Sequence, residues 1–164
     1  MPPELNVDPA TLDVNHVIAD REAIRKVNKQ RFEMEQIDAI IYEDKTLHIV
    51  AGYKDLRPDE FWIKGHMPGY PLFPGVLMCE AAAQVSSYYI MNNKLLECDF
   101  VGFGGLENVR FRGAVYVGDR LLIISKLVKL HRRQVVTNFQ GFVNKTMVIH
   151  GDIIGVPLHN KREE

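Results

Sequence analysis

One segment near the middle of the chain constrains the fold most. Residues 75–93 read GVLMCEAAAQVSSYYIMNN. The three consecutive alanines favour a helix, and the two asparagines at its end can terminate it. Because the segment is apolar almost all round, a helix formed here must be buried on most sides. A single domain of 164 residues, 46% of them hydrophobic, is large enough to cover it.

Strand patterns lie on both sides of this helix. Residues 35–43 and 46–53 (EQIDAIIYE and TLHIVAGY) predict a hairpin, and residues 119–133 and 134–145 predict two long strands joined at a basic tip. Residues 146–153 alternate in the two-residue period of a half-buried strand. We therefore expect an α+β fold in which an antiparallel sheet wraps one long central helix. Such a sheet leaves an open edge, which oligomerisation commonly covers.

The N-terminal part of the chain is less regular. Residues 1–15 carry three prolines and predict a loose arm. A short helix is expected from Asp20, which can cap it, with Ile24 and Val27 on one face. The arm is acidic and lacks an apolar core segment, so no signal peptide is expected here. No apolar run reaches the length of a membrane span, and the cytoplasm is the expected location.

Charge and cysteine content exclude several classes of function. The net charge is −1, from 20 Lys and Arg against 21 Asp and Glu, which argues against nucleic acid as the main partner. Two cysteines, Cys79 and Cys98, are too few for a disulfide scaffold or a Cys-rich zinc site. We expect both to be buried thiols. No histidine pairs with another ligand at metal-binding spacing, so no metal is expected.

Three candidate catalytic features lie close together in the sequence. Glu80 sits among apolar residues of the predicted helix, where a buried carboxylate must be paired or protonated. A protonated carboxyl can serve as a general acid. His66 stands in a loop rich in glycine and proline and is a candidate general base. Gly75 begins the helix, where free N–H groups can hold an oxyanion. Together they predict proton abstraction next to a carbonyl.

Each of these features also has a plainer interpretation. Glu80 could reach solvent or cap a neighbouring backbone group, His66 could be a surface residue, and Gly75 could serve only the turn after Pro74. The residues alone leave these alternatives open and do not identify the substrate.

Two blocks of the sequence resemble a known family. Residues 65–84, GHMPGYPLFPGVLMCEAAAQ, closely resemble the signature G-H-F-P-G-x-P-x-x-P-G-V-L-x-x-E-x-x-A-Q of the 3-hydroxyacyl-[acyl-carrier-protein] dehydratases of the FabZ type. Residues 108–121, NVRFRGAVYVGDRL, resemble the downstream block K-V-R-F-R-R-P-V-x-P-G-D-x-L of that family. The resemblance covers roughly residues 31–156, so we expect an N-terminal arm with a short helix (1–30), a dehydratase domain (31–156) and a C-terminal tail (157–164).

The resemblance implies the hot-dog fold and a homodimer, in some relatives a trimer of dimers, with active sites at the dimer interface. His66 matches the catalytic histidine, and Glu80 matches the catalytic carboxylate, which the other subunit contributes. Gly75 matches the glycine whose N–H polarises the thioester carbonyl, and Gln84 matches the glutamine that supports the carboxylate. The implied reaction removes water from a (3R)-hydroxyacyl thioester to give a trans-2-enoyl thioester. No cofactor is implied beyond the phosphopantetheine that carries the substrate on acyl-carrier protein.

Substrate and carrier contacts are harder to predict. Met67 stands where the family signature has an aromatic residue, and with Tyr70 and Phe73 it is a candidate for lining the acyl tunnel, although aromatic residues in this loop could equally serve packing. Because acyl-carrier protein is acidic, its docking surface should be basic. The candidates are Arg110 and Arg112 in the second block, and Lys129, Arg132 and Arg133 at the hairpin tip, which could also be an ordinary solvated turn.

The sequence leaves two other functions open. A hot-dog acyl-CoA hydratase or thioesterase would use a similar fold, and release of free thiol would separate a thioesterase from a dehydratase. A non-catalytic acyl-binding subunit is the other alternative. A damaged pair of catalytic residues would be typical of such a subunit, whereas His66 and Glu80 are both present here.

Overall fold

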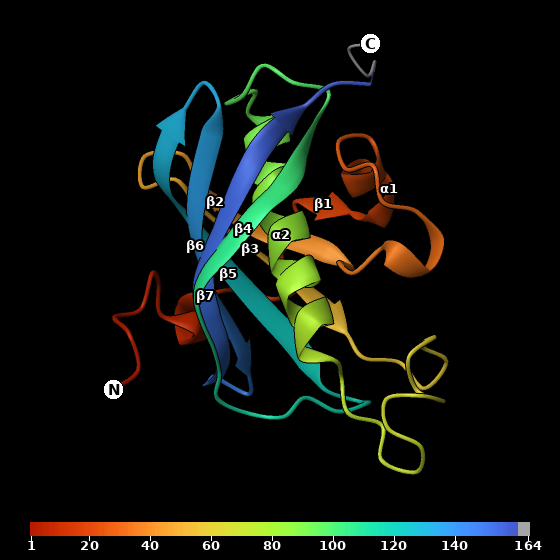
Figure 1. The fold of residues 1–164 in the computed structure, drawn as a ribbon. Coiled ribbons are helices and arrows are strands. Elements are labelled where there is room, and N and C mark those ends of the chain that lie inside the picture. The colour runs from red at the N-terminus through yellow and green to blue at the C-terminus, as the bar shows by residue number, and fades with distance from the viewer. Residues whose placement is uncertain (161–164) are drawn as a thin grey trace.

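The computed structural model describes residues 1–160, and residues 161–164 of the expected C-terminal tail lie outside the described residues. Helix α2 (Gly75–Asn92) packs against one face of a seven-stranded antiparallel sheet that curves around it (Figure 1). The strand order is β1-β2-β3-β5-β6-β7-β4. This arrangement confirms the expected hot-dog architecture. In chain order the strands are β1 (Ala19–Asp20), β2 (Ala39–Asp44), β3 (Ile49–Asp55), β4 (Phe100–Phe111), β5 (Arg120–His131), β6 (Gln134–Val143) and β7 (Thr146–Leu158).

Helix α2 is buried as its composition predicts. Ala81, Ala82 and Val85 are fully buried between the helix and the sheet. Small residues let the two elements approach closely: a side chain at Gly52 of β3 would lie 3.3 Å from the Val85 side chain. One stripe of the helix remains open to solvent in the single chain, and it comprises Val76, Glu80, Ala83, Ser87 and Met91.

The expected hairpins are confirmed, because β2 pairs with β3 and β5 pairs with β6. The short N-terminal helix α1 (Arg21–Arg25) begins as expected, with the Asp20 side chain accepting the Ala23 N–H. It is shorter than the pattern suggested. The chain turns away at Asn28, whose side chain donates to the Gln84 carbonyl of α2 at 3.0 Å. Two 3₁₀ turns, η1 (Pro9–Thr11) and η2 (Phe32–Met34), complete the structure.

The N-terminal arm is not loose, which corrects the expectation for residues 1–15. Asn6 hydrogen-bonds through its N–H to Gln140 Oε1 and through its side chain to Asn138 Oδ1, both on β6. Val7 and Leu12 pack on a second apolar cluster on the outer face of the sheet, away from α2. Local composition could not show this, because the hydrogen-bond partners of the arm lie more than a hundred positions away. The buried members of that cluster are Ala39, Ile41, Ile49, Ala51, Leu122, Ile124 and Phe142.

Strand β4 forms one edge of the sheet and pairs only with β7 among the described residues. Gly102, Gly104 and Gly105 in its first half lie within one continuous strand whose register shifts between Phe103 and Gly105. A Cβ at Gly102 would lie 2.3 Å from Leu158 Cδ1 of β7, so any other residue here would require the Leu158 side chain to move. Half or more of the side chains of β4 are exposed, including Phe103, Leu106 and Phe111.

Within residues 1–160, no helix is both long enough and apolar enough to cross a membrane.

Candidate active site

Glu80 lies on the second turn of α2 and is held by a side chain one turn further along. Gln84 Nε2 donates to Glu80 Oε1 at 2.8 Å. The same amide nitrogen donates to the Met34 carbonyl at 2.7 Å, and Gln84 Oε1 accepts the Gln36 N–H at 2.8 Å. Gln84 is only 2% exposed, so these partners rather than water satisfy its amide.

The contacts of Gln84 determine which oxygen of Glu80 is free. A backbone carbonyl can only accept and a backbone N–H can only donate, so Met34 and Gln36 fix the orientation of the Gln84 amide. Its NH₂ group therefore faces Glu80, and Oε1 of that carboxyl always accepts. A proton carried by Glu80 would have to sit on Oε2. The carboxyl is thus arranged to hold or release a proton at one defined atom.

His66 is positioned by the loop that precedes α2. Its backbone N–H donates to the Trp62 carbonyl at 2.8 Å, and its ring Nδ1 lies 2.8 Å from the Leu72 carbonyl oxygen. Because that oxygen only accepts, Nδ1 carries a proton. In the neutral imidazole, Nε2 then has a free lone pair, which is the form that a general base requires.

Gly75 is the first residue of α2. The N–H groups of Leu77 and Met78 donate to the Pro74 carbonyl, whereas the N–H of Gly75 has no acceptor within residues 1–160. A free donor at a helix N-terminus can stabilise a developing oxyanion. A Cβ at this position would lie 2.6 Å from the exposed Phe111 ring of β4, so any other residue would require that ring to move.

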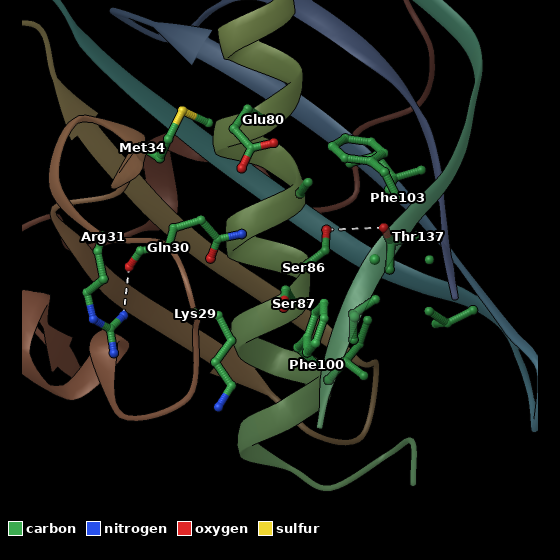
Figure 2. Close-up of a pocket in the computed structure, with 17 residues that line it drawn as sticks. Lys29, Gln30, Arg31, Met34, Glu80, Ser86, Ser87, Phe100, Phe103 and Thr137 are labelled. Carbon is green, nitrogen blue, oxygen red and sulfur yellow. Dashed lines mark hydrogen bonds between the residues drawn. The ribbon is translucent and has the colours of Figure 1, made fainter. Parts of the chain in front are cut away.

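A groove of about 510 Å³ runs along the open stripe of α2 next to Glu80. In Figure 2 the segment that carries Lys29, Gln30 and Arg31 forms one wall, and Phe100 and Phe103 of β4 lie on the other side of the helix. The groove is large enough for part of an extended acyl chain. The remaining lining residues are Met34, Glu80, Ala83, Ser86, Ser87, Ile90, Val101, Gly102, Val135, Thr137, Ile153 and Gly155.

The predicted catalytic residues divide into two groups in the single chain. Gln84 and Glu80 are in contact, and Glu80 lines the groove. His66 is not among the residues that line the groove. It belongs to the loop before α2, and this loop extends below the helix in Figure 1.

The tunnel candidates differ in their surroundings. Met67 and Tyr70 are about half exposed and close a turn by two backbone hydrogen bonds to each other. The Tyr70 hydroxyl lies 2.6 Å from that of Tyr116. Phe73 is 1% exposed and packs against Trp62 with ring centroids 5.3 Å apart. Its place in the core favours the packing alternative over a tunnel wall.

The docking candidates lie at two ends of the molecule. Arg110 and Arg112 flank Phe111, which contacts the start of α2 at Gly75, and both arginines are exposed. The hairpin tip with Lys129, Arg132 and Arg133 is also exposed. It lies beside the segment that follows α2, since Arg132 shares a cavity with residues 94–97 (Figure 1). An 18-residue helix is about 27 Å long, so the tip is remote from Gly75.

Three residues that support the site were missed by the sequence predictions. Asn28, Met34 and Gln36 hold Gln84 and its neighbouring backbone. Two of these contacts use backbone groups, which leave no signal in the sequence. The buried glutamine at 36, beside the apolar strand that follows, is a weak signal that could have been noticed.

Neither cysteine is arranged as a nucleophile. Burial raises the pKa of the Cys79 thiol, and burial likewise raises the pKa of the Cys98 thiol. A raised pKa keeps a thiol protonated and unreactive at neutral pH. Among the residues that the structure describes, no group of three or more His, Cys, Asp or Glu side chains is placed to hold a metal ion.

The FabA-like domain family matches residues 28–152, which is more than half of the chain. The chain belongs to the FabA-like family. Among its relatives is the 3-hydroxyacyl-[acyl-carrier-protein] dehydratase FabZ of Moorella thermoacetica, 30% identical over 135 residues that cover 82% of this chain and 94% of the relative. The FabZ of Acinetobacter baumannii is 37% identical over 114 residues, covering 68% and 77%. The family resemblance read from residues 65–84 is therefore confirmed.

Solved structures support the fold of this FabA-like chain. It is similar to the dehydratase heterocomplex ApeI:P from Xenorhabdus doucetiae, with a TM-score of 0.69 and 14% identity, covering 82% of this chain and 90% of that one. It is also similar to a sigma28-regulated virulence protein from Campylobacter jejuni, with a TM-score of 0.63 and 16% identity, covering 85% and 93%. At these identities the likeness concerns the fold alone.

Proposed function

We propose that this FabA-like chain is a dehydratase that removes water from (3R)-3-hydroxyacyl thioesters on acyl-carrier protein in fatty-acid biosynthesis. Its relatives named FabZ support this activity. The single structural observation that carries the proposal is the oriented Glu80 carboxyl, whose Oε1 is occupied by Gln84 and whose Oε2 is free to hold a proton.

The first half of the reaction is assigned to His66. With Nδ1–H donated to the Leu72 carbonyl, Nε2 takes the proton from C2 of the substrate, next to the thioester carbonyl. Negative charge then moves onto the carbonyl oxygen. The free N–H of Gly75 at the start of α2 stabilises that charge.

The second half is assigned to Glu80. Its Oε2 gives a proton to the C3 hydroxyl, directly or through a water molecule, and the C3–O bond breaks to release water. The electron pair left at C2 forms the trans C2–C3 double bond. The proton on His66 and the charge on Glu80 are then exchanged with solvent, which returns both groups to their starting forms. No cofactor takes part, and phosphopantetheine is only the carrier of the acyl group.

We propose that the working form is a homodimer that joins two copies along β4. Within residues 1–160 the outer edge of this strand has no pairing partner, and it carries exposed apolar side chains, which in a monomer would favour aggregation. The open stripe of α2 beside it carries Glu80, while His66 lies outside the groove of its own chain. A second copy seated on this side would cover the stripe and could bring its own His66 to Glu80. The trimer of dimers implied by the family resemblance remains a prediction, as does the cytoplasmic location, where the carrier protein would be met.

The reaction itself is the first test. The purified protein should convert (3R)-3-hydroxybutyryl thioester of acyl-carrier protein into the trans-2-enoyl thioester and hydrate crotonyl thioester in reverse, followed by the absorbance of the enoyl thioester. A parallel assay of free thiol should stay at the background rate. Thiol release at a rate matching loss of substrate would instead identify a thioesterase, and binding without turnover would identify a non-catalytic subunit.

Carrier docking is proposed at Arg110 and Arg112, because these exposed cations flank Phe111, whose ring lies against the start of α2 at Gly75. We expect Arg112→Glu to raise the KM for the carrier-bound substrate roughly tenfold, as repulsion from an acidic partner would, and to leave kcat on a short pantetheine thioester unchanged. The matched control is Arg133→Glu at the hairpin tip, which should have little effect. A larger effect at Arg133 would place docking at the tip instead.

A further inference from the structure

A buried ion pair lies under the loop that carries His66. Lys54, near the end of β3, is 2% exposed, and its Nζ lies 2.9 Å from Oε1 of Glu60. The Glu60 side chain is itself only 11% exposed. The side chain of Lys54 is on the same face of β3 as Gly52, the face that meets α2. Burying two charges costs desolvation energy, and removing one partner leaves the other charge buried and unpaired, which costs more. A role for this ion pair beyond stability is therefore worth seeking.

The ion pair contacts the loop both before His66 (the first arm of the loop) and after it (the second arm). On the first arm, Glu60 also accepts the Arg57 N–H, and its carbonyl accepts the Ile63 N–H. On the second arm, Lys54 Nζ lies 5.8 Å from the centroid of the Phe73 ring, a cation–π contact in a desolvated site. One side chain of the sheet thus contacts residues before and after His66.

The two arms meet at Trp62, which packs on Phe73 and holds the backbone at His66. The ring centroids of Trp62 and Phe73 are 5.3 Å apart. The Trp62 carbonyl accepts N–H groups from Gly65 and His66. The imidazole in turn binds the Leu72 carbonyl, and Leu72 directly precedes Phe73. A continuous set of contacts therefore runs from Lys54 to the atom that selects the tautomer of His66.

We propose that Lys54 and Glu60 are positioning residues, which hold the His66 imidazole with Nδ1 protonated and Nε2 free by fixing both arms of its loop to β3. Neither residue contacts the substrate, and their effect passes through Trp62, Phe73 and the Leu72 carbonyl. The inference rests on the proposed function for its effect on turnover, but the state of the imidazole can be measured without any substrate.

The test compares three variants with a matched control. Lys54→Met removes the charge and keeps the length of the side chain, but it leaves Glu60 buried without its partner and should lower the melting temperature. The double variant Lys54→Met/Glu60→Gln removes both charges and should regain much of that stability. Lys54→Arg keeps a donor for Glu60. The control, Arg120→Met, breaks the ion pair with Asp55 between β5 and β3 without contacting the loop.

Two quantities are measured for each variant, the kinetic constants and the ¹⁵N chemical shifts of His66, which distinguish a ring protonated at Nδ1 from one protonated at Nε2. In the double variant we expect kcat to fall about tenfold or more with little change in KM, because a slightly displaced base loses rate rather than binding. The shifts should report a mixture of tautomers. Lys54→Arg should recover part of kcat, and Arg120→Met should match the wild type in both readouts.

The outcomes separate this inference from the proposed function. If the double variant regains stability, kcat and a single Nδ1–H tautomer together, the ion pair serves stability alone and the positioning role is overturned. If the wild-type protein shows no dehydration, the proposed function fails, yet the tautomer comparison still decides whether the ion pair orients His66.

Discussion

Replacing His66 with asparagine should lower kcat for dehydration about a thousandfold, the range that a general base contributes. Asparagine is chosen because its side-chain amide can still donate to the Leu72 carbonyl, which accepts from His66 Nδ1 in the structure. The loop should then keep its shape, while no group with the basicity of imidazole remains at the Nε2 position. The measurement is steady-state turnover of a carrier-bound (3R)-3-hydroxyacyl thioester, with the melting temperature recorded beside it.

The matched control for this variant is His131→Asn, which changes a histidine at the exposed hairpin tip. It should leave both turnover and melting temperature unchanged. If His66→Asn retained wild-type turnover with an intact fold, the base would have to be another group and the assignment of His66 would be wrong.

Replacing Glu80 with glutamine should produce a loss of similar size, a few hundredfold or more in kcat. The amide keeps the size of the carboxyl, and its oxygen can still accept from Gln84 Nε2, so the network to Met34 and Gln36 should remain. What is lost is the proton at Oε2 that the C3 hydroxyl needs in order to leave as water. Turnover and circular dichroism of the same sample provide the measurement.

The two inactive variants together test whether the site is shared between copies. In a heterodimer of His66→Asn with Glu80→Gln, one site would contain both replacements and the other neither. Random mixing of equal amounts should therefore restore about a quarter of wild-type activity, because half of the dimers are mixed and each has one intact site. Each variant carried through the same mixing procedure alone should stay inactive. A mixture that stays inactive although mixed dimers are isolated would contradict the shared site.

The main elements of this fold follow from local patterns. The run of alanines and the nearly continuous apolar surface of residues 75–93 were sufficient to predict a buried helix, and the structure has α2 at Gly75–Asn92. The hairpins followed from alternation and turn residues. Short-range steric and hydrophobic preferences determine these features, so they can be read from a window of sequence.

The residues of the candidate site were predicted from the sequence, whereas their geometry was not. His66, Gly75, Glu80 and Gln84 were named from motif and setting, since the chemistry requires those residue types. The tautomer of His66 depends on the Leu72 carbonyl, and the orientation of Gln84 depends on a carbonyl and an N–H. Backbone groups are the same at every position of the chain, so no residue type marks which of them will be used.

Long-range packing decided what the sequence left open. The proline-containing arm was expected to be loose, yet it is ordered by Asn138 and Gln140 of β6, which fold against it from the other end of the chain. Phe73 was a candidate tunnel residue, but it is enclosed by Trp62 and the buried Lys54. Sequence patterns were enough to predict the helix and the strands, because these depend on neighbours along the chain. The atoms that each side chain faces depend on residues distant in sequence, and only the folded chain brings those together.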